Sequence, residues 1–426
     1  DPAHRSWRSG IRSGAGHPLI KGILALAVLA GGGCVLLRGK DAEPEPLPVY
    51  LEHLNDSITN SRSDIPELYP LDQAVDSFMN YWALHGVSLS ITRNDSLVYA
   101  KGYGKADATT PMAPGTTLRM ASVSKLLTAV AVMKLQEEGK VFLDTPVFGP
   151  LGVLNKYDSY IRDDNYYLIT VEHLLRHQAG FTTRGGDPVF SPYSSRDALL
   201  RKQLGRTLAY EPGTWQEYSN FGFLLLSLVI EEVAGMPYED FLQADVFAPA
   251  LCSGFRIGGN YLKDRLPGET RYYMQPDAEK TASFDGQYAS VEKCYGGNNV
   301  TGSAGAGGWT GSTVELARLV ACIDGKGPLQ DILSEFSVAQ MTNYFDPETF
   351  GLGWNDCKPD GEWTRSGSFS GTQALIKTYP DGECWVFISN TSAWRGSRFS
   401  RDIAGLFTSL RNRFSPLLPR RDLFQE

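Results

Sequence analysis

The chain has 426 residues, of which 42% are hydrophobic and 21% are charged, and it contains 20 Tyr, 20 Phe and 8 Trp. This length and composition can bury a large core and allow two lobes, and they exclude an intrinsically disordered scaffold. The formal net charge of −8 argues against nucleic acid as a partner. The six cysteines include no C-x-x-C pair, which excludes the common zinc and thioredoxin-like motifs.

The N-terminal segment has the pattern of a targeting signal. Residues 1–21 are basic, residues 22–37 form an uncharged apolar run, and residues 38–65 have the composition of a linker. Sixteen uncharged residues fall just short of the usual membrane span, so a signal peptide and a membrane anchor both stay open. Our first expectation is an anchor in a bacterial cell envelope, with the folded part on the periplasmic side. A lipoprotein modified at Cys34 comes second, and an organellar transit peptide comes third.

The remaining residues, 66–426, are expected to form one folded domain with strands near both of its ends. Strands are predicted at 87–92, 96–100, 373–379 and 384–389, and helices at 70–84 and 401–414. Between them, at about 120–340, helical stretches alternate with long loops. This order predicts an α+β fold in which one antiparallel sheet is built from both ends and a helical lobe is inserted.

Ser122-Val123-Ser124-Lys125 stands before a run of strong helix formers that ends at Gly139. If Ser122 begins this helix, Lys125 lies one turn further on the same face, and its amine can reach the serine hydroxyl. A serine hydroxyl becomes a good nucleophile when a neighbouring base accepts its proton, so the pair is a candidate for covalent catalysis. The alternative is a serine that only caps the helix. A second match, Ser290-Val291-Glu292-Lys293, has no helix behind it and is expected to be a chance match.

Two further motifs follow in the chain. Tyr218-Ser219-Asn220 precedes a second apolar helix, predicted at 221–233, and Arg365-Ser366-Gly367 begins a strand-like block. The three motifs in this order resemble those of the serine β-lactamase and penicillin-binding superfamily. The resemblance is to the branch of class C β-lactamases, D-alanyl-D-alanine carboxypeptidases and related esterases. It covers about residues 75–395 and implies the same sheet with an inserted helical lobe.

The resemblance implies roles for the first two motifs. Ser122 would be the nucleophile, Lys125 would share in proton transfer, and Tyr218 would act as the general base and acid. Burial and a neighbouring cation would lower the pKa of Lys125, and cations would help Tyr218 to ionise. Whether tyrosine or lysine is the base stays open. Asn220 would hydrogen-bond the lysine or a substrate amide, or else cap the second helix.

The third motif departs from the family pattern, because Arg365 stands where Lys or His is usual. Arginine keeps a cation that could bind a substrate carboxylate, but it cannot act as a proton shuttle. Gly367 would leave space for the substrate backbone, and Ser366 would belong to the same substrate-binding strand. The N–H groups of Ser122 and Ser368 are the oxyanion hole that the resemblance implies.

Other candidate features are better explained by structural roles. His173 and His177 have the spacing of a metal pair on a helix, but a third ligand is not evident, and structural roles are expected. The glycine-rich residues 302–309 predict a tight turn beside the active site. Cys357 and Cys384 flank the C-terminal strands and could form a disulfide, although free buried thiols are expected.

These motifs predict a serine hydrolase that acts through an acyl-enzyme on an amide, β-lactam or ester carbonyl, without a metal or cofactor. We favour an esterase or peptidase acting on a small molecule or peptide over a true β-lactamase, with a carboxylate on the substrate as a candidate feature. The rival hypothesis is a non-catalytic envelope protein that binds peptidoglycan or a partner through the same cleft. Arg365 is the one feature in its favour. The sequence does not predict an oligomeric state.

Overall fold

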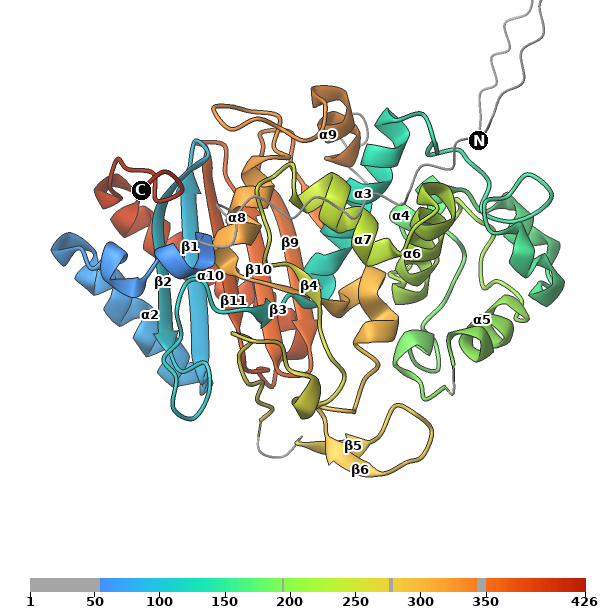
Figure 1. The fold of residues 1–426 in the computed structure, drawn as a ribbon, viewed down its shortest axis with the longest axis horizontal. Helices are drawn as coiled ribbons and strands as arrows, with labels where there is room; N and C mark the ends of the chain where they lie inside the picture. Colours follow the sequence, from blue (N-terminus) through green and yellow to red (C-terminus); the bar gives the residue numbers. More distant parts are fainter. Residues whose placement is uncertain (1–53, 194, 276–278, 343–349) are drawn as a thin grey trace, which may run out of the picture. The chain divides into compact units, whose positions relative to one another are not determined.

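A six-stranded antiparallel sheet forms the centre of the structure, with its strands in the order β2-β1-β11-β10-β9-β8 (Figure 1). The computed structural model describes residues 54–193, 195–275, 279–342 and 350–426. Because β1 pairs with β11, strands from the two ends of the domain are neighbours, which confirms the predicted α+β fold. The strands are β1 (Gly86–Arg93), β2 (Ser96–Gly104), β8 (Asp356–Cys357), β9 (Trp363–Phe369), β10 (Thr372–Thr378) and β11 (Glu383–Ser389).

The hairpin of β1 and β2 forms where the sequence predicts it. Asn94 and Asp95 in its turn both have positive φ, 45° and 64°. Asparagine and aspartate tolerate this region better than most residues, and such a turn matches the right-handed twist of the strands it joins. The local sequence is therefore sufficient to set this hairpin.

Both faces of the sheet are buried. On one face, Val87 and Leu89 of β1 pack with α2 (Tyr69–Trp82) and α10 (Phe399–Phe414). On the other face, the hydroxyls of Ser88 and Ser90 lie 2.7 and 2.8 Å from the hydroxyl of Thr313 in α8 (Thr313–Ala321). Successive side chains of a strand point to opposite faces, so β1 serves two different environments.

The helical lobe holds most of the other helices, and α5 and α6 lie on the side of the sheet away from β2 (Figure 1). Eleven of the 14 residues of α3 and 11 of the 15 residues of α6 are buried, and these two helices contribute many side chains to the larger core cluster. Both were predicted, with bounds that differ by a few residues. The helices are α3 (Ser124–Glu137), α4 (Val171–Leu175), α5 (Arg196–Leu204), α6 (Asn220–Ala234), α7 (Tyr238–Leu242) and α9 (Glu335–Met341).

Two smaller sheets complete the strands. The strands β3 (Leu118–Arg119), β7 (Trp309–Gly311) and β4 (Arg256–Ile257) form one of them. The other pairs β5 (Lys280–Ala282) with β6 (Ser290–Glu292). Ser290 thus lies exposed on a short strand and not at a helix start, which confirms that the second S-x-x-K is a chance match.

Residues 54–64, which we call the N-terminal strap, differ from the predicted linker. They form α1 (Leu54–Ser57) and the 3-10 helix η2 (Asn60–Ser63). Ile58 is only 1% exposed, and it packs with Leu97 of β2. The linker prediction for these residues is wrong because two apolar side chains, Leu54 and Ile58, and a few polar contacts hold the strap, and none of these produces a periodic pattern in the sequence.

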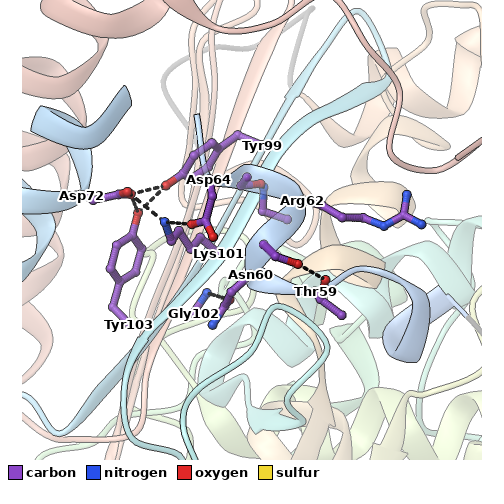
Figure 2. Close-up of polar contacts among 12 residues, drawn as sticks. Thr59, Asn60, Arg62, Asp64, Asp72, Tyr99, Lys101, Gly102 and Tyr103 are labelled. Atoms are coloured by element: carbon purple, nitrogen blue, oxygen red, sulfur yellow. Dashed lines mark hydrogen bonds and ion pairs between the residues drawn. The ribbon is translucent and has the colours of Figure 1, made fainter. Parts of the chain in front are cut away.

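The strap covers the backbone of β2, which is an edge strand of the sheet (Figure 2). Asn60 Oδ1 accepts a hydrogen bond from Gly102 N at 2.8 Å, and Asn60 Nδ2 donates to Met112 O at 2.9 Å. Ser63 Oγ accepts from Ala100 N at 3.0 Å. Figure 2 also shows Lys101 between the strap and α2, where it forms ion pairs with Asp64 and Asp72. Edge strands expose unpaired N–H groups, and here side chains satisfy two of them.

The described cysteines confirm the expectation of free thiols, because Cys252, Cys294, Cys322, Cys357 and Cys384 are all buried and unpaired. Cys34 and the apolar run 22–37 lie outside the described residues, as do the basic segment 1–21 and the first part of the linker. Within the described ranges no single helix has the length and hydropathy of a membrane span, although α6 and the following Tyr238–Phe247, bent by 76°, meet these criteria as a pair.

Candidate active site

Ser122 lies in the 3-10 helix η4 (Ala121–Val123), immediately before α3. The predicted helix therefore begins two residues later than expected. Ala121 has a positive φ of 49°, which a non-glycine residue adopts only when its surroundings impose it. The turn directs the Ser122 hydroxyl toward two partners: Tyr218 OH donates to Oγ at 2.8 Å, and Lys125 Nζ donates to it at 3.2 Å.

Lys125 is fully buried, and its ammonium group has three hydrogen-bond acceptors. Besides Ser122 Oγ, these are Asn220 Oδ1 at 2.6 Å and Ala306 O at 2.5 Å. The three donors of the ammonium are thus used in a fixed geometry. Burial lowers the pKa of Lys125 to about 8, with Tyr218 opposing the shift and Arg365 adding to it. The amine can therefore exchange a proton near neutral pH.

Tyr218 is partly exposed and lies between the nucleophile and two cations. Burial by itself would raise the pKa of its phenol. The charges of Lys125 and Arg365 outweigh burial and lower this pKa to about 8. Lys125 Nζ also lies 4.8 Å from the centre of the Tyr218 ring. The pKa values of Tyr218 and Lys125 are thus both brought to about 8, so the two groups titrate as a coupled pair beside Ser122 Oγ.

Asn220 is the first residue of α6, but it does not cap the helix. The cap is Ser219, whose Oγ accepts from Gly222 N at 3.0 Å. The amide of Asn220 is therefore available to the site: its Oδ1 accepts from Lys125, and its Nδ2 donates to Asp187 Oδ2 at 2.7 Å. Of the roles that the sequence left open, the structure shows the contact with lysine and assigns the cap to Ser219.

Arg365 is 1% exposed, and its guanidinium points at the serine turn. Nε donates to Ser122 O at 2.8 Å, and Nη2 donates both to the same carbonyl and to Tyr218 OH, the latter at 3.4 Å. The charge is thus buried and engaged with the protein itself, and the binding of a substrate carboxylate by Arg365 stays a prediction. The sequence placed a cation at this position of the motif. It did not predict that β9 would bring the guanidinium against the main-chain carbonyl of Ser122.

The rest of the third motif meets the site through the backbone of β9. A Cβ on Gly367 would lie 2.5 Å from Met120 O and 3.0 Å from Ser122 N, so only glycine lets the strand approach this closely. The flanking serines have partners beside the strand. Ser366 N and Oγ lie 2.7 and 3.2 Å from Asn355 Oδ1, and Ser368 Oγ accepts from Gln373 Nε2 at 3.1 Å.

The glycine-rich residues 302–309 flank the site, as predicted. They form two short turns, Thr301–Ser303 and Ala304–Gly308, that approach α3. The carbonyl of Ala306 holds Lys125, and the carbonyl of Gly305 accepts from Thr128 Oγ1 at 2.7 Å. The loop thus binds the lysine through one backbone oxygen and α3 through another, which no side-chain pattern could reveal.

The two histidines do not form a metal pair. The helix α4 ends at Leu175, so only His173 lies on it. Each Nδ1 accepts a hydrogen bond from a main-chain amide, His173 from Thr170 N at 3.2 Å and His177 from Ser219 N at 3.1 Å. Among the residues that the structure describes, no three His, Cys, Asp or Glu side chains gather as a metal site would require.

Sequence reasoning missed two residues that contact the site. Asp187 orients the Asn220 amide, and His177 packs its ring against Tyr218 with the ring centres 4.5 Å apart. Asp187 precedes a proline and caps the short turn Pro188–Phe190, a signal that marks a helix start and nothing more. Neither side chain is linked to the site by any local spacing.

The model of the beta-lactamase family matches residues 71–408, so the chain belongs to this family. A "Putative D-alanyl-D-alanine carboxypeptidase" of Escherichia coli O157:H7 is 28% identical over 324 residues, which are 69% of this chain and 72% of that protein. Esterase EstB of Burkholderia gladioli is 28% identical over 194 residues, 42% of this chain and 48% of the esterase.

Among solved structures, the D-amino acid amidase from Ochrobactrum anthropi SV3, complexed with L-phenylalanine, has a similar fold with a TM-score of 0.63. It is 19% identical, and the likeness covers 84% of this chain and 98% of the amidase. The amidase thus supports the fold. The family match, with the carboxypeptidase and the esterase among the relatives, confirms the predicted class: the protein is a serine hydrolase that acts on a carbonyl through an acyl-enzyme.

Proposed function

We propose that Ser122 is the nucleophile and that Tyr218 and Lys125 share its proton. The observation that carries this assignment is the pair of contacts on Ser122 Oγ, 2.8 Å from Tyr218 OH and 3.2 Å from Lys125 Nζ. When the Tyr218–Lys125 pair has lost one proton, it can accept the proton of Ser122 as Oγ attacks the substrate carbonyl carbon. The pair returns this proton to the leaving group, which departs and leaves an ester on Ser122.

Hydrolysis of that ester uses the same groups in reverse order. The pair takes a proton from water, the hydroxide attacks the ester carbonyl, and the proton returns to Ser122 Oγ as the acid product leaves. We propose the N–H groups of Ser122 and Ser368 as donors to the developing oxyanion. The close approach of β9 at Gly367 supports this, because it holds the strand against Ser122 N.

For the substrate we propose small neutral esters and amides. The support is the position of Arg365, whose charge is buried against Ser122 O and Tyr218 and would have to leave both to pair with a substrate carboxylate. An esterase and an amidase occur among the similar proteins. The likeness to the carboxypeptidase favours a second candidate, a carboxylate-bearing peptide substrate. Membrane association through residues 22–37 stays a proposal supported by hydropathy and flanking charge.

Intact-protein mass spectrometry with two probes tests this function. After incubation with an activated phenyl ester, we expect a transient acyl adduct on Ser122, and with a fluorescent penicillin a weaker adduct or none. In Ser122→Ala both the adduct and turnover should disappear, with a rate loss of several powers of ten. Ser290→Ala is the matched control and should behave as wild type.

Three outcomes would contradict the proposal in whole or in part. Labelling or turnover that persists in Ser122→Ala would remove Ser122 as the nucleophile. A folded wild-type protein that neither probe acylates and that hydrolyses neither would support the non-catalytic rival. A stronger reaction with the penicillin than with the ester would favour the carboxylate-bearing substrate class.

A further inference from the structure

We infer that His177 is the positioning residue that holds the Tyr218 hydroxyl on Ser122. The inference rests on the proposed function, because it assigns a role toward the proposed proton acceptor. It starts from an unusual concentration of contacts: His177 touches three consecutive residues of one segment, 217, 218 and 219.

The three contacts are of different kinds. The main-chain carbonyl of His177 accepts from Glu217 N at 2.9 Å. Its ring lies against the Tyr218 ring, with centres 4.5 Å apart and planes tilted by 33°. Its Nδ1 accepts from Ser219 N at 3.1 Å. Because His177 contacts the ring of Tyr218 and the main-chain amides of the residues before and after it, Tyr218 has little freedom to move relative to the histidine.

The segment needs such support because it has no regular secondary structure of its own. Residues 215–219 lie between a turn and the start of α6, outside any helix or strand. No helical or sheet hydrogen-bond ladder therefore sets the backbone at Tyr218. The Ser122–Tyr218 distance therefore depends on contacts that this segment makes with residues outside it. His177 makes such contacts with Tyr218 and with the residues on both sides of it.

His177 is itself held firmly. It is 4% exposed, and its ring also lies 5.1 Å from the Phe223 ring and 5.4 Å from the Phe350 ring. Its φ of 59° lies in the left-handed region, which histidine, asparagine and aspartate enter more readily than other non-glycine residues. This conformation lets the chain end α4 and present both the carbonyl and the ring to the same segment. Such strain persists only where the surroundings over-determine it.

The charge state of the ring agrees with this role. Burial holds the pKa of His177 well below its usual range, and the nearby charges of Lys125 and Arg365 lower it further. The ring is therefore neutral, and Nδ1 carries the lone pair that the Ser219 N–H requires. A charged ring would lose this acceptor and would repel the two cations that promote ionisation of Tyr218. A neutral imidazole supports the tyrosine without changing its electrostatics.

The test compares three variants of the full chain in ester hydrolysis over a range of pH. His177→Phe keeps an aromatic ring but removes the acceptor, so the segment should shift; kcat should fall about 100-fold, with KM within about threefold. The acidic limb of kcat should also move to higher pH, because Tyr218 moves away from its cations. His177→Asn keeps an acceptor and tolerates positive φ but lacks the ring, so it should recover part of kcat yet stay below wild type.

His173→Ala is the matched control, because the Nδ1 of His173 makes the same kind of contact nearby, but with Thr170 N at the start of α4 and not with Ser219 N. It should lower stability without changing kcat or the acidic limb. If His177→Phe does not fold, His177→Asn decides. The inference is overturned if His177→Asn has wild-type kcat and acidic limb, or if His173→Ala changes kcat as much as His177→Phe. Ser122→Ala, measured in parallel, separates the proposed function from the inference about His177. Turnover that persists in Ser122→Ala would remove the proposed function. An inactive Ser122→Ala beside fully active His177 variants would remove only the inference.

Discussion

Asn60→Ala tests whether the N-terminal strap is part of the folded domain. The side chain makes two hydrogen bonds, one from Gly102 N on the edge strand and one to Met112 O. Each such bond contributes about 0.5–1.5 kcal/mol, so the variant should lower the free energy of unfolding by about 1–3 kcal/mol. Thr59→Ala is the control, because this exposed side chain hydrogen-bonds the neighbouring Ser61 hydroxyl at the surface, and its loss should change stability by less than about 0.5 kcal/mol.

The same variant should leave catalysis intact. The sheet order puts β2 four strand spacings from β9, or roughly 19 Å, so a local change at the edge does not reach Ser122. Urea unfolding followed by tryptophan fluorescence gives the stability, and ester hydrolysis below the unfolding transition gives the activity. Adding Ser63→Ala removes the acceptor of Ala100 N, and the bared edge should then promote self-association, which light scattering detects. A wild-type urea midpoint for Asn60→Ala, or lost activity while it is fully folded, would refute the reasoning.

Two further predictions concern the site. The proposed active form of the Lys125–Tyr218 pair has lost one of its two protons, so kcat/KM should fall as pH drops below about 8. Arg365→Ala should move this acidic limb to higher pH, because it removes a cation that lowers the pKa of Tyr218. Arg365→Ala should also lower kcat/KM, and by the same factor on neutral and on carboxylate-bearing esters. A decrease confined to the carboxylate-bearing esters would instead show that Arg365 binds the carboxylate. Gly367→Ala should lower kcat at least about tenfold in a folded protein, because the added Cβ would push β9 away from Ser122. Gly405→Ala in α10 is the control and should have no effect, because a Cβ there would meet open space. Equal activities of the two variants would contradict the close approach of β9.

The sequence by itself determined the class of fold, and it predicted the three residues that we propose as the nucleophile and its proton-transfer partners. Alternating runs at 87–92 and 96–100 set the first hairpin, because strand period and turn chemistry act over a few residues. The spacing of Ser122 and Lys125 works in the same way, since three residues make one turn of a helix. Tyr218 was placed by its motif and by the apolar helix behind it. Each of these features is encoded in a short stretch of sequence, where the spacing of residue types is enough to predict the local structure.

The tertiary structure decided which groups act on the nucleophile from elsewhere in the chain. Arg365 lies 243 residues from Ser122 in sequence, and whether its charge faces a substrate or the serine turn depends on how β9 meets η4. Asn220 lies 95 residues from Lys125, and by sequence alone it could equally have capped α6; in the structure Ser219 is the cap. The strap followed the same rule: Asn60 satisfies a strand 42 residues away, and its composition resembled a linker. Partners at such separations are set by chain topology and packing, which leave no period in the sequence.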